Sequence, residues 1–320
     1  MGQQTSYRLS GVDAPEVTPG DIAAAASRID GFVRRTPVLA LGHVMSDSYS
    51  LTLKLEHLQV TGSFKPRGAF SVLTANDVPP IGVVAASGGN FGIAISYAAS
   101  RLGHAATVFV PETSPSEKIL RIGEFGADVR VVPGYYDEAR AASEEHGAET
   151  GAFQAQAYDH LDVMAGQGTL AREIESQVPV DVVLCAVGGG GLIGGVASWF
   201  RHRATVVAVE PELCRSFNAA LEATHPVGVE VSGVASSSLG ARVVGRNPWR
   251  AREWIDQSVL VSDGDIIAAQ RWLWTEMKMA VEPAAATPLA ALRTGRYQPD
   301  AGANVVVVLS GANVDPASVV

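Results

Sequence analysis

Thr61-Gly62-Ser63-Phe64-Lys65-Pro66-Arg67-Gly68-Ala69 presents one lysine in a setting that favours chemical reaction. Pro66 disfavours the α conformation for the residue before it, so we expect Lys65 to lie outside a helix. Gly62 and Gly68 let the backbone turn tightly on either side, and Phe64 offers an apolar wall beside the amine. A partly desolvated lysine on such a turn can lose its proton and attack a carbonyl. Ordinary turns share this composition, so the stretch alone leaves the catalytic interpretation open.

The composition is that of a globular protein large enough for two lobes, with 320 residues of which 47% are hydrophobic. A net charge of −9 without any run of Lys or Arg argues against nucleic acid or an anionic membrane as the partner. No stretch reaches the length of a membrane span. The first residues lack the basic and apolar regions of a signal peptide, so we expect a cytoplasmic protein. Cys185 and Cys214 are expected to be reduced.

Strand and helix patterns alternate along most of the chain, which is typical of an α/β fold with parallel sheets. A helix start signal lies at Thr18-Pro19-Gly20-Asp21. The Gly- and Ser-rich residues 224–238 predict a long loop near a site or on the surface. Strands are predicted at 51–55, 83–86, 106–110, 129–132, 182–187, 206–209 and 305–309, and helices from about 90, 115 and 136 and over 162–177, 192–200 and 263–279.

The strongest local signal is the run Gly188-Gly189-Gly190-Gly191-Leu192, which follows a predicted strand and opens a helix. Without Cβ atoms, this backbone can wrap an anion and aim several N–H groups at a phosphate. A flexible connection and a dinucleotide site are the alternatives. The dinucleotide is less favoured because the spaced Gly-x-Gly-x-x-Gly pattern is missing, although Glu210 lies near the distance at which an acid would be expected.

Two further loops follow apolar strands. Ser87-Gly88-Gly89-Asn90 can form a second anion-binding corner, suited to a substrate carboxylate. Asn90 is able either to cap the next helix or to donate to an oxygen of a bound ligand. Ser310 stands at the end of the last strand, where a hydroxyl can meet a ring nitrogen or simply close a turn. Neither interpretation prevails for Asn90 or Ser310 alone.

Six motifs occur in the order and approximate spacing of fold-type II enzymes that use pyridoxal 5'-phosphate (PLP). The chain most resembles their branch of serine/threonine dehydratases and serine racemases, from about residue 20 to 315. This resemblance implies two lobes, each with a mostly parallel twisted sheet flanked by helices: a large PLP-binding lobe, 1–77 and 157–320, and a small lobe, 78–156. The motifs are Gly62-Ser63-Phe64-Lys65-Pro66-Arg67-Gly68-Ala69, Ser87-Gly88-Gly89-Asn90, Ala165-Gly166-Gln167-Gly168-Thr169, Gly188-Gly189-Gly190-Gly191, Glu282-Pro283 and Leu309-Ser310-Gly311-Ala312-Asn313.

The resemblance also implies a role for each matching residue. Lys65 would hold PLP through a Schiff base, and Gly188, Gly189, Gly190, Gly191 and Leu192 would hold its phosphate. Asn90 would bond the ring hydroxyl, Phe64 would flank the ring, and Ser310 would face the pyridine nitrogen. A neutral serine there leaves the nitrogen unprotonated, which favours loss of a β-substituent over storage of a carbanion.

Three departures from the family pattern affect the substrate and metal sites. Gly88 stands where serine racemases have a serine that acts as acid and base, so we expect only hydrogen on this side of the site. Glu210 matches a family ligand for a divalent metal, but Ser216 stands where its partner Asp would be, so a metal is left uncertain. Tyr158 would lie near the cofactor and, with the Ser87, Gly88 and Gly89 loop, would contact the substrate.

These expectations describe a PLP-dependent dehydratase, or ammonia-lyase, acting on a β-hydroxy amino acid such as L-threonine or L-serine. A serine racemase-like isomerase and a hydroxyaspartate-type dehydratase remain open alternatives. A protein that binds PLP or another small ligand without turnover is the alternative outside enzymes. The resemblance also implies a homodimer with an amino acid as its small-molecule partner.

Overall fold

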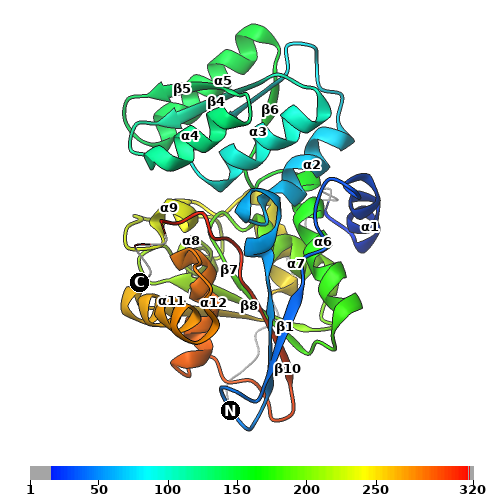
Figure 1. The fold of residues 1–320 in the computed structure, drawn as a ribbon, viewed down its shortest axis with the longest axis vertical. Coiled ribbons are helices and arrows are strands. Elements are labelled where there is room, and N and C mark those ends of the chain that lie inside the picture. The colour runs from blue at the N-terminus through cyan, green and yellow to red at the C-terminus, as the bar shows by residue number, and fades with distance from the viewer. Residues whose placement is uncertain (1–15, 316, 318–320) are drawn as a thin grey trace.

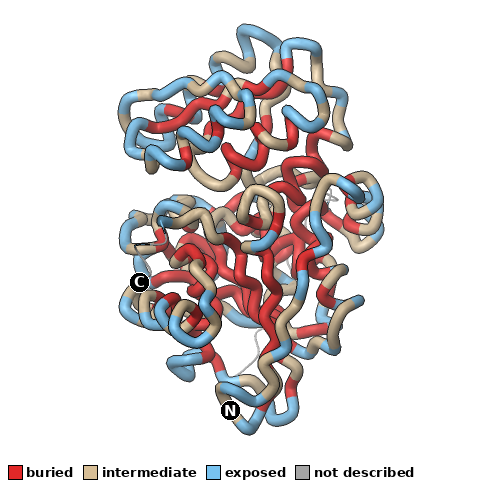
Figure 2. The backbone as a smooth tube through the Cα atoms, viewed as in Figure 1, coloured by how far each residue is buried: buried red, intermediate tan, exposed pale blue. Residues whose placement is uncertain are grey.

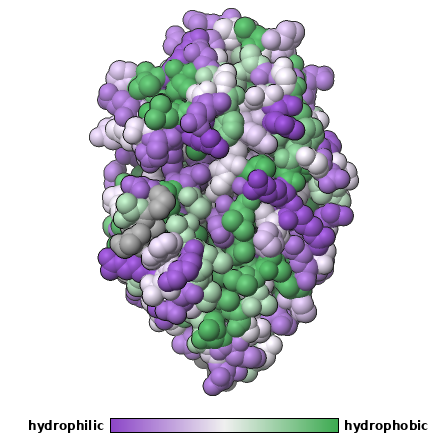
Figure 3. Space-filling view, in the orientation of Figure 1, coloured by the Kyte–Doolittle hydropathy of each residue, from purple (hydrophilic) through white to green (hydrophobic). Residues whose placement is uncertain are grey.

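The computed structural model describes residues 16–315 and 317, which form two α/β lobes stacked along the long axis of the molecule (Figure 1). A six-stranded sheet lies in one lobe and a four-stranded sheet in the other. The strand sets support a lobe boundary near residues 77 and 157, which we retain as a proposal. Hydrophilic residues cover much of the face in Figure 3, and hydrophobic patches gather over the larger lobe.

The large sheet has the order β1-β2-β10-β7-β8-β9. All neighbouring pairs are parallel except β1 and β2, which are antiparallel. Because β10 lies between β2 and β7, segments from the two ends of the chain become neighbours. The strands are β1 Val38–Gly42, β2 Ser50–Lys54, β7 Val182–Ala186, β8 Thr205–Pro211, β9 Gln257–Val261 and β10 Asn304–Val308.

The small sheet has the order β5-β4-β3-β6 and is entirely parallel. Its strands are β3 Val83–Ala86, β4 Ala106–Pro111, β5 Asp128–Val132 and β6 Phe153–Ala155. All residues of β3 and β7 are buried, as expected for parallel strands covered by helices (Figure 2). The predicted α/β fold with mostly parallel sheets is therefore confirmed.

Helices flank both sheets, and among the described residues none is long and apolar enough to cross a membrane. The longer helices are α1 Pro19–Arg28, α2 Lys65–Ala75, α3 Asn90–Leu102, α4 Ser116–Glu124, α5 Tyr136–Thr150, α6 Leu161–Gln177, α7 Gly191–Phe200, α8 Ser216–Ala223, α11 Asp263–Met277 and α12 Pro283–Arg293. Short helical turns are α9 Ser236–Leu239, α10 Arg246–Arg250, and the 3₁₀ turns Glu56–Leu58, Val60–Gly62 and Ala251–Trp254.

Helix α2 joins the two lobes. Its Phe70 side chain belongs to the apolar cluster of the small lobe, where it meets α3, and its ring stacks on Phe32 with centroids 4.9 Å apart. On its other side α2 packs closely on α6. A Cβ on Gly166 would lie 2.4 Å from the Arg67 carbonyl oxygen, so only glycine permits this approach.

Lys65 is the first residue of α2, so the prediction that it lies outside a helix is wrong. A proline in the first turn sacrifices no intrahelical hydrogen bond, which is why Pro66 can follow it there. The expected turn at Gly62 is confirmed by its φ of +75°. The expected turn at Gly68 is wrong. Gly68 lies inside α2, and its missing Cβ makes room for the Gln167 side chain of α6.

A buried cluster of four charges fixes the start of α2. Arg67 binds Glu56 through two hydrogen bonds of 2.8 Å, and it also contacts Glu173 at 2.8 Å. Lys54 binds the other oxygen of Glu173 at 2.8 Å. The side chains of Lys54, Glu56 and Arg67 are fully buried and that of Glu173 is only 16% exposed, so the two positive and two negative charges neutralise one another largely out of contact with water.

Replacing Arg67 with Met should strongly destabilise the protein because it leaves Glu56 buried without its partner. We expect a loss of about 3–5 kcal/mol in the free energy of unfolding, measured by chemical denaturation. The matched control is Arg121→Met, which breaks the exposed pair with Glu124 and should cost less than about 1 kcal/mol. Equal effects of the two substitutions would contradict this account.

Candidate active site

The site lies where the carboxyl ends of parallel strands from both sheets face the junction of the lobes. Lys65 follows β2, the tetraglycine loop follows β7 and Ser310 follows β10. Ser87 follows β3 of the small sheet. Ligands of open parallel sheets bind beyond the carboxyl ends of their strands. This topology therefore brings together the loops that the sequence singled out.

Hydrogen bonds fasten the Lys65 turn to the segment after β10. The Phe64 N–H donates to the Ser310 carbonyl at 3.0 Å, and the Ala312 N–H donates to the Gly62 carbonyl at 2.9 Å. Between these bonds, Ser63 and Gly311 form an antiparallel bridge. Ser310 therefore occupies a fixed position beside the turn that carries Lys65.

The Lys65 amine lies in a largely apolar setting. Its Nζ donates to the Ala157 carbonyl at 3.2 Å and lies 5.0 Å from the centre of the Phe64 ring and 5.9 Å from that of Phe91. Burial lowers the pKa of Lys65 to about 8, although the negative charge of Glu282 acts in the opposite direction. A substantial fraction of the amine is therefore neutral, and nucleophilic, near neutral pH.

Asn90 belongs to a polar network and does not cap α3, whose N-cap residue is Gly89. Its Nδ2 donates to Glu282 at 2.7 Å, and its Oδ1 accepts from Asn313 at 2.8 Å. Lys118 binds the other oxygen of Glu282 at 2.8 Å, and both of these side chains are buried. The network connects the small lobe to the segments that precede α12 and follow β10.

The tetraglycine loop presents backbone donors at the start of α7. Gly190 has a φ of +92°, a conformation that favours glycine. Among the described residues, no acceptor is found for the backbone N–H groups of Gly189, Gly190, Gly191 and Leu192. These donors and the positive end of α7 suit a phosphate group.

Tyr158 packs on this same loop. A Cβ on Gly189 would lie 2.4 Å from the Tyr158 ring, so the missing side chain makes room for the tyrosine. Burial, aided by Tyr136 and Asp159, raises the pKa of Tyr158 to about 12, so its hydroxyl stays protonated at neutral pH. With Arg140 and its neighbours it lines a cavity of about 530 Å³, which also includes the Ala157 whose carbonyl contacts Lys65.

The Ser87 loop ends at the N-terminus of α3, which has no side-chain cap. The Ser87 hydroxyl accepts from the Gly89 N–H at 3.3 Å. The expectation that only hydrogen lies beside Gly88 is wrong. The space where a Cβ would extend from Gly88 is filled by the side chain of Ser114, whose Oγ lies 1.8 Å from the position of that Cβ.

Glu210 is a helix-capping carboxylate. Its two oxygens accept from the Phe217 and Asn218 N–H groups, both at 2.8 Å, at the start of α8. Burial raises the pKa of Glu210 to about 8, against the opposing effect of these hydrogen bonds. The described residues contain no group of three or more His, Cys, Asp or Glu able to hold a metal ion. The structure thus gives Glu210 a structural role at the start of α8, and a metal contact of Glu210 stays an untested prediction.

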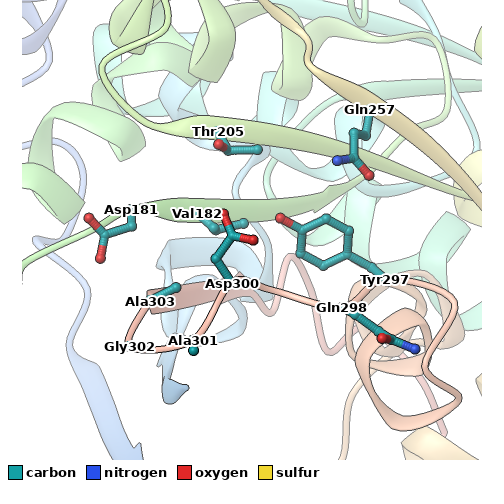
Figure 4. Close-up of a pocket in the computed structure, with 10 residues that line it drawn as sticks. All are labelled: Asp181, Val182, Thr205, Gln257, Tyr297, Gln298, Asp300, Ala301, Gly302 and Ala303. Atoms are coloured by element: carbon teal, nitrogen blue, oxygen red, sulfur yellow. The ribbon is translucent and has the colours of Figure 1, made fainter. Parts of the chain in front are cut away.

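A second cavity, of about 440 Å³, lies at the opposite edge of the large sheet (Figure 4). It is bordered by the residues where β7 and β8 begin, Val182 and Thr205, and by the segment that leads into β10, including Tyr297 and Asp300. The residues proposed to react lie at the carboxyl ends of these strands. This second cavity is therefore separate from the candidate active site.

The structure adds residues that sequence reasoning did not assign to the site: Glu282, Asn313, Lys118 and Ser114. Glu282 and Asn313 were within recognised motifs but carried no role. Lys118 and Ser114 follow β4, and the rule that ligands meet the carboxyl ends of strands would have pointed to this loop as well.

The fold and site define a two-lobed α/β protein in which a lysine of lowered pKa and a glycine-rich loop follow strands β2 and β7 of the same sheet. The family model for pyridoxal-phosphate dependent enzymes matches residues 29–311, and the chain belongs to this family. Its cofactor is therefore PLP. The described residues fit PLP, because they combine a lysine of lowered pKa, the flanking Phe64 ring and the open N–H groups of the tetraglycine loop.

Similar proteins include two curated ammonia-lyases. The L-threonine ammonia-lyase of Geobacter sulfurreducens is 35% identical over 303 residues, covering 92% of this chain and 75% of that protein. The L-threo-3-hydroxyaspartate ammonia-lyase of a Pseudomonas species is 33% identical over 307 residues, covering 92% and 95%. Among solved structures, maize serine racemase superposes with a TM-score of 0.89 at 28% identity, covering 95% of this chain and 96% of that one.

The lowered pKa of Lys65 should govern how the cofactor-free protein takes up PLP. Only the neutral amine attacks an aldehyde, so the uptake rate should rise with pH through a midpoint near 8 instead of the ordinary lysine value of 10.5. Glu282→Gln should move the midpoint to lower pH, because it removes the charge that favours protonated Lys65. Stopped-flow absorbance provides the measurement. A midpoint at or above 10 in the wild type would refute the assignment.

The tetraglycine loop should tolerate no side chain at position 189. In Gly189→Ala, the new Cβ would collide with the Tyr158 ring and displace either the ring or the loop. Loss of one hydrogen bond to the phosphate should weaken PLP affinity at least about tenfold, measured by titration of the cofactor-free protein. Gly228→Ala is the control, since no atom lies within 4 Å of its added Cβ. Unchanged affinity in Gly189→Ala would exclude this role for the loop.

Proposed function

We propose that this protein is a PLP-dependent ammonia-lyase that converts L-threonine or L-serine to a 2-oxo acid and ammonia. The observation that carries the proposal is the position of Lys65, a lysine of lowered pKa on a turn hydrogen-bonded to the Ser310 segment. The curated ammonia-lyases at 33–35% identity support the same reaction class. A neutral hydroxyl at Ser310 favours β-elimination, as argued from the sequence.

Each site residue has a proposed part in this reaction. PLP, when bound, supplies the electron sink that makes the substrate α-proton acidic. Lys65 would hold the cofactor, and its amine, when free, would remove the α-proton of the substrate as a general base. The N–H groups of Gly188 to Leu192 hold the phosphate, while Asn90 donates to the ring hydroxyl. Phe64 covers one side of the ring.

The substrate carboxylate is assigned to the Ser87-Gly88-Gly89 loop, where the N-terminus of α3 has no side-chain cap. Tyr158 borders the substrate on the cavity side. Its neutral hydroxyl can donate a proton to the departing β-hydroxyl, which then leaves as water. Hydrolysis of the remaining unsaturated amine then yields the 2-oxo acid and ammonia.

The holoenzyme should release 2-oxo acid from L-threonine or L-serine, and Lys65→Ala should lose at least about a thousandfold in kcat. Coupled lactate dehydrogenase, which oxidises NADH as 2-oxo acid forms, provides the assay. Lys278→Ala, the same substitution at an exposed lysine whose Nζ donates to the Thr275 carbonyl, is the matched control and should retain most of the activity. Absence of 2-oxo acid from both substrates would contradict the proposal.

Product analysis and a wider substrate panel distinguish the alternatives. The similarity to maize serine racemase supports an isomerase as the alternative. If the protein is an isomerase, chiral chromatography should find D-serine as the main product from L-serine. L-threo-3-hydroxyaspartate added to the substrate panel tests the activity named for the Pseudomonas relative. PLP binding without any turnover would indicate a ligand-binding protein.

We also propose a cytoplasmic homodimer. Cys185 and Cys214 are both free and buried, which supports a reducing compartment. Dimerisation rests on the resemblance to fold-type II enzymes, and light scattering of the purified protein tests it.

A further inference from the structure

Ser114 occupies the space that a side chain at position 88 would need. Its Oγ lies 1.8 Å, and its Cβ 2.5 Å, from the position that a Cβ on Gly88 would take. Real Cβ atoms do not approach other heavy atoms so closely. A side chain on residue 88 and the present Ser114 side chain therefore cannot occupy the site together.

The backbone fixes Ser114 in this place. Its N–H donates to the Pro111 carbonyl at 3.0 Å in the turn between β4 and α4, and Pro115 restricts the conformation of Ser114 from the other side. Strands β3 and β4 are parallel neighbours, with Ala86 opposite Phe109. The two loops that follow them therefore leave the same edge of the small sheet and meet at Gly88.

This meeting point belongs to the active site. Asn90, two residues after Gly88, binds Glu282, and Phe91 lies 5.9 Å from the Lys65 amine. Lys118, four residues after Ser114, reaches the same Glu282 from the other loop. Two independent segments thus converge on Glu282, with Gly88 and Ser114 in contact between them.

The chemistry around Ser114 suits a carboxylate. Among the described residues no acceptor is found for the hydroxyl of the half-buried Ser114, so its proton is available to a ligand. The nearby cation, Lys118, is already paired with Glu282 in a buried salt bridge. A substrate carboxylate in this corner must therefore be held mainly by neutral donors such as hydroxyl and backbone N–H groups.

We propose that the Ser114 hydroxyl binds the α-carboxylate of the amino-acid substrate, from the place that a side chain at position 88 would otherwise occupy. This inference rests on the proposed function for the identity of the substrate class. Ser114, in the loop after β4, thus becomes a substrate-binding residue next to the Ser87 loop, which follows β3. Positions 88 and 114 are consequently coupled: either can provide the hydroxyl, but both cannot provide it at once.

Binding of L-alanine to the PLP-loaded protein tests the proposal. L-Alanine has the amine and the carboxylate but no β-hydroxyl to lose, so its binding is measured without turnover, from the change in the absorption of PLP. Ser114→Ala should raise the Kd for L-alanine at least about tenfold, because a hydrogen bond to a charged group is lost. PLP content should stay unchanged. Ser116→Ala, at an exposed serine of the same segment, is the matched control and should bind normally.

Reciprocal exchange supplies the second arm. Gly88→Ser alone should also weaken L-alanine binding, since its side chain overlaps that of Ser114. The double variant Gly88→Ser with Ser114→Gly removes both the Oγ and the Cβ that overlap the new side chain. It should bind within about threefold of wild type, a reversal that independent sites would not show. Wild-type affinity in Ser114→Ala, or a double variant that binds no better than Ser114→Gly alone, would overturn the proposal. L-Alanine binding stays measurable even if L-threonine and L-serine are not eliminated, so the two proposals fail separately.

Discussion

Arg67 carries its charge where no solvent reaches it, and the geometry of the site depends on the neutralisation of that charge. Removing a guanidinium from water costs several kcal/mol, which only closely placed carboxylates can offset. Although burial disfavours its charge, Glu56 and Glu173 hold the pKa of Arg67 above its usual value. Glu56 follows β2, and Glu173 belongs to α6, so the cluster ties the segment after β2 and helix α6 to α2. Lys65, two residues before Arg67, is thereby fixed in position without any contact of its own to these charges.

A second constraint sets which distant loops meet at Lys65. Strand β10, near the end of the chain, inserts between β2 and β7. Its position brings Ser310 beside the Lys65 turn and places both within reach of the loop that follows β7. The small sheet adds the loops after β3 and β4 from across the lobe junction. Helix α2 connects these halves, since it contributes Lys65 to the site and Phe70 to the core of the small lobe. Packing of the small lobe and placement of the reactive amine are therefore linked through one helix.

The sequence predicted the elements whose position depends on a local pattern of apolar residues and glycines. Apolar runs bounded by glycine located most strands, and 83–86 coincides with β3. Helix α12 escaped prediction because Pro288 lies in its interior, where proline disfavours a helix, and its stability comes from burial of its small side chains. Strand β6 has only three residues, too few for a periodic signal. Lys65 and the glycine loop were recognisable from composition. Ser114 was not, because its importance arises only when the loops after β3 and β4 meet in space.

The partners of Asn90 determine which of its amide atoms donates and which accepts. A carboxylate only accepts, so the Asn90 amide nitrogen must face Glu282, and its carbonyl oxygen must face Asn313. Asn313 donates both of its amide hydrogens, one to Asn90 and one to the Thr61 carbonyl at 2.8 Å. Asn90 keeps one hydrogen uncommitted by these contacts. Since the orientation of the amide is imposed from both sides, its remaining hydrogen is held ready for an acceptor, and this supports our proposal that Asn90 donates to the ring hydroxyl of PLP.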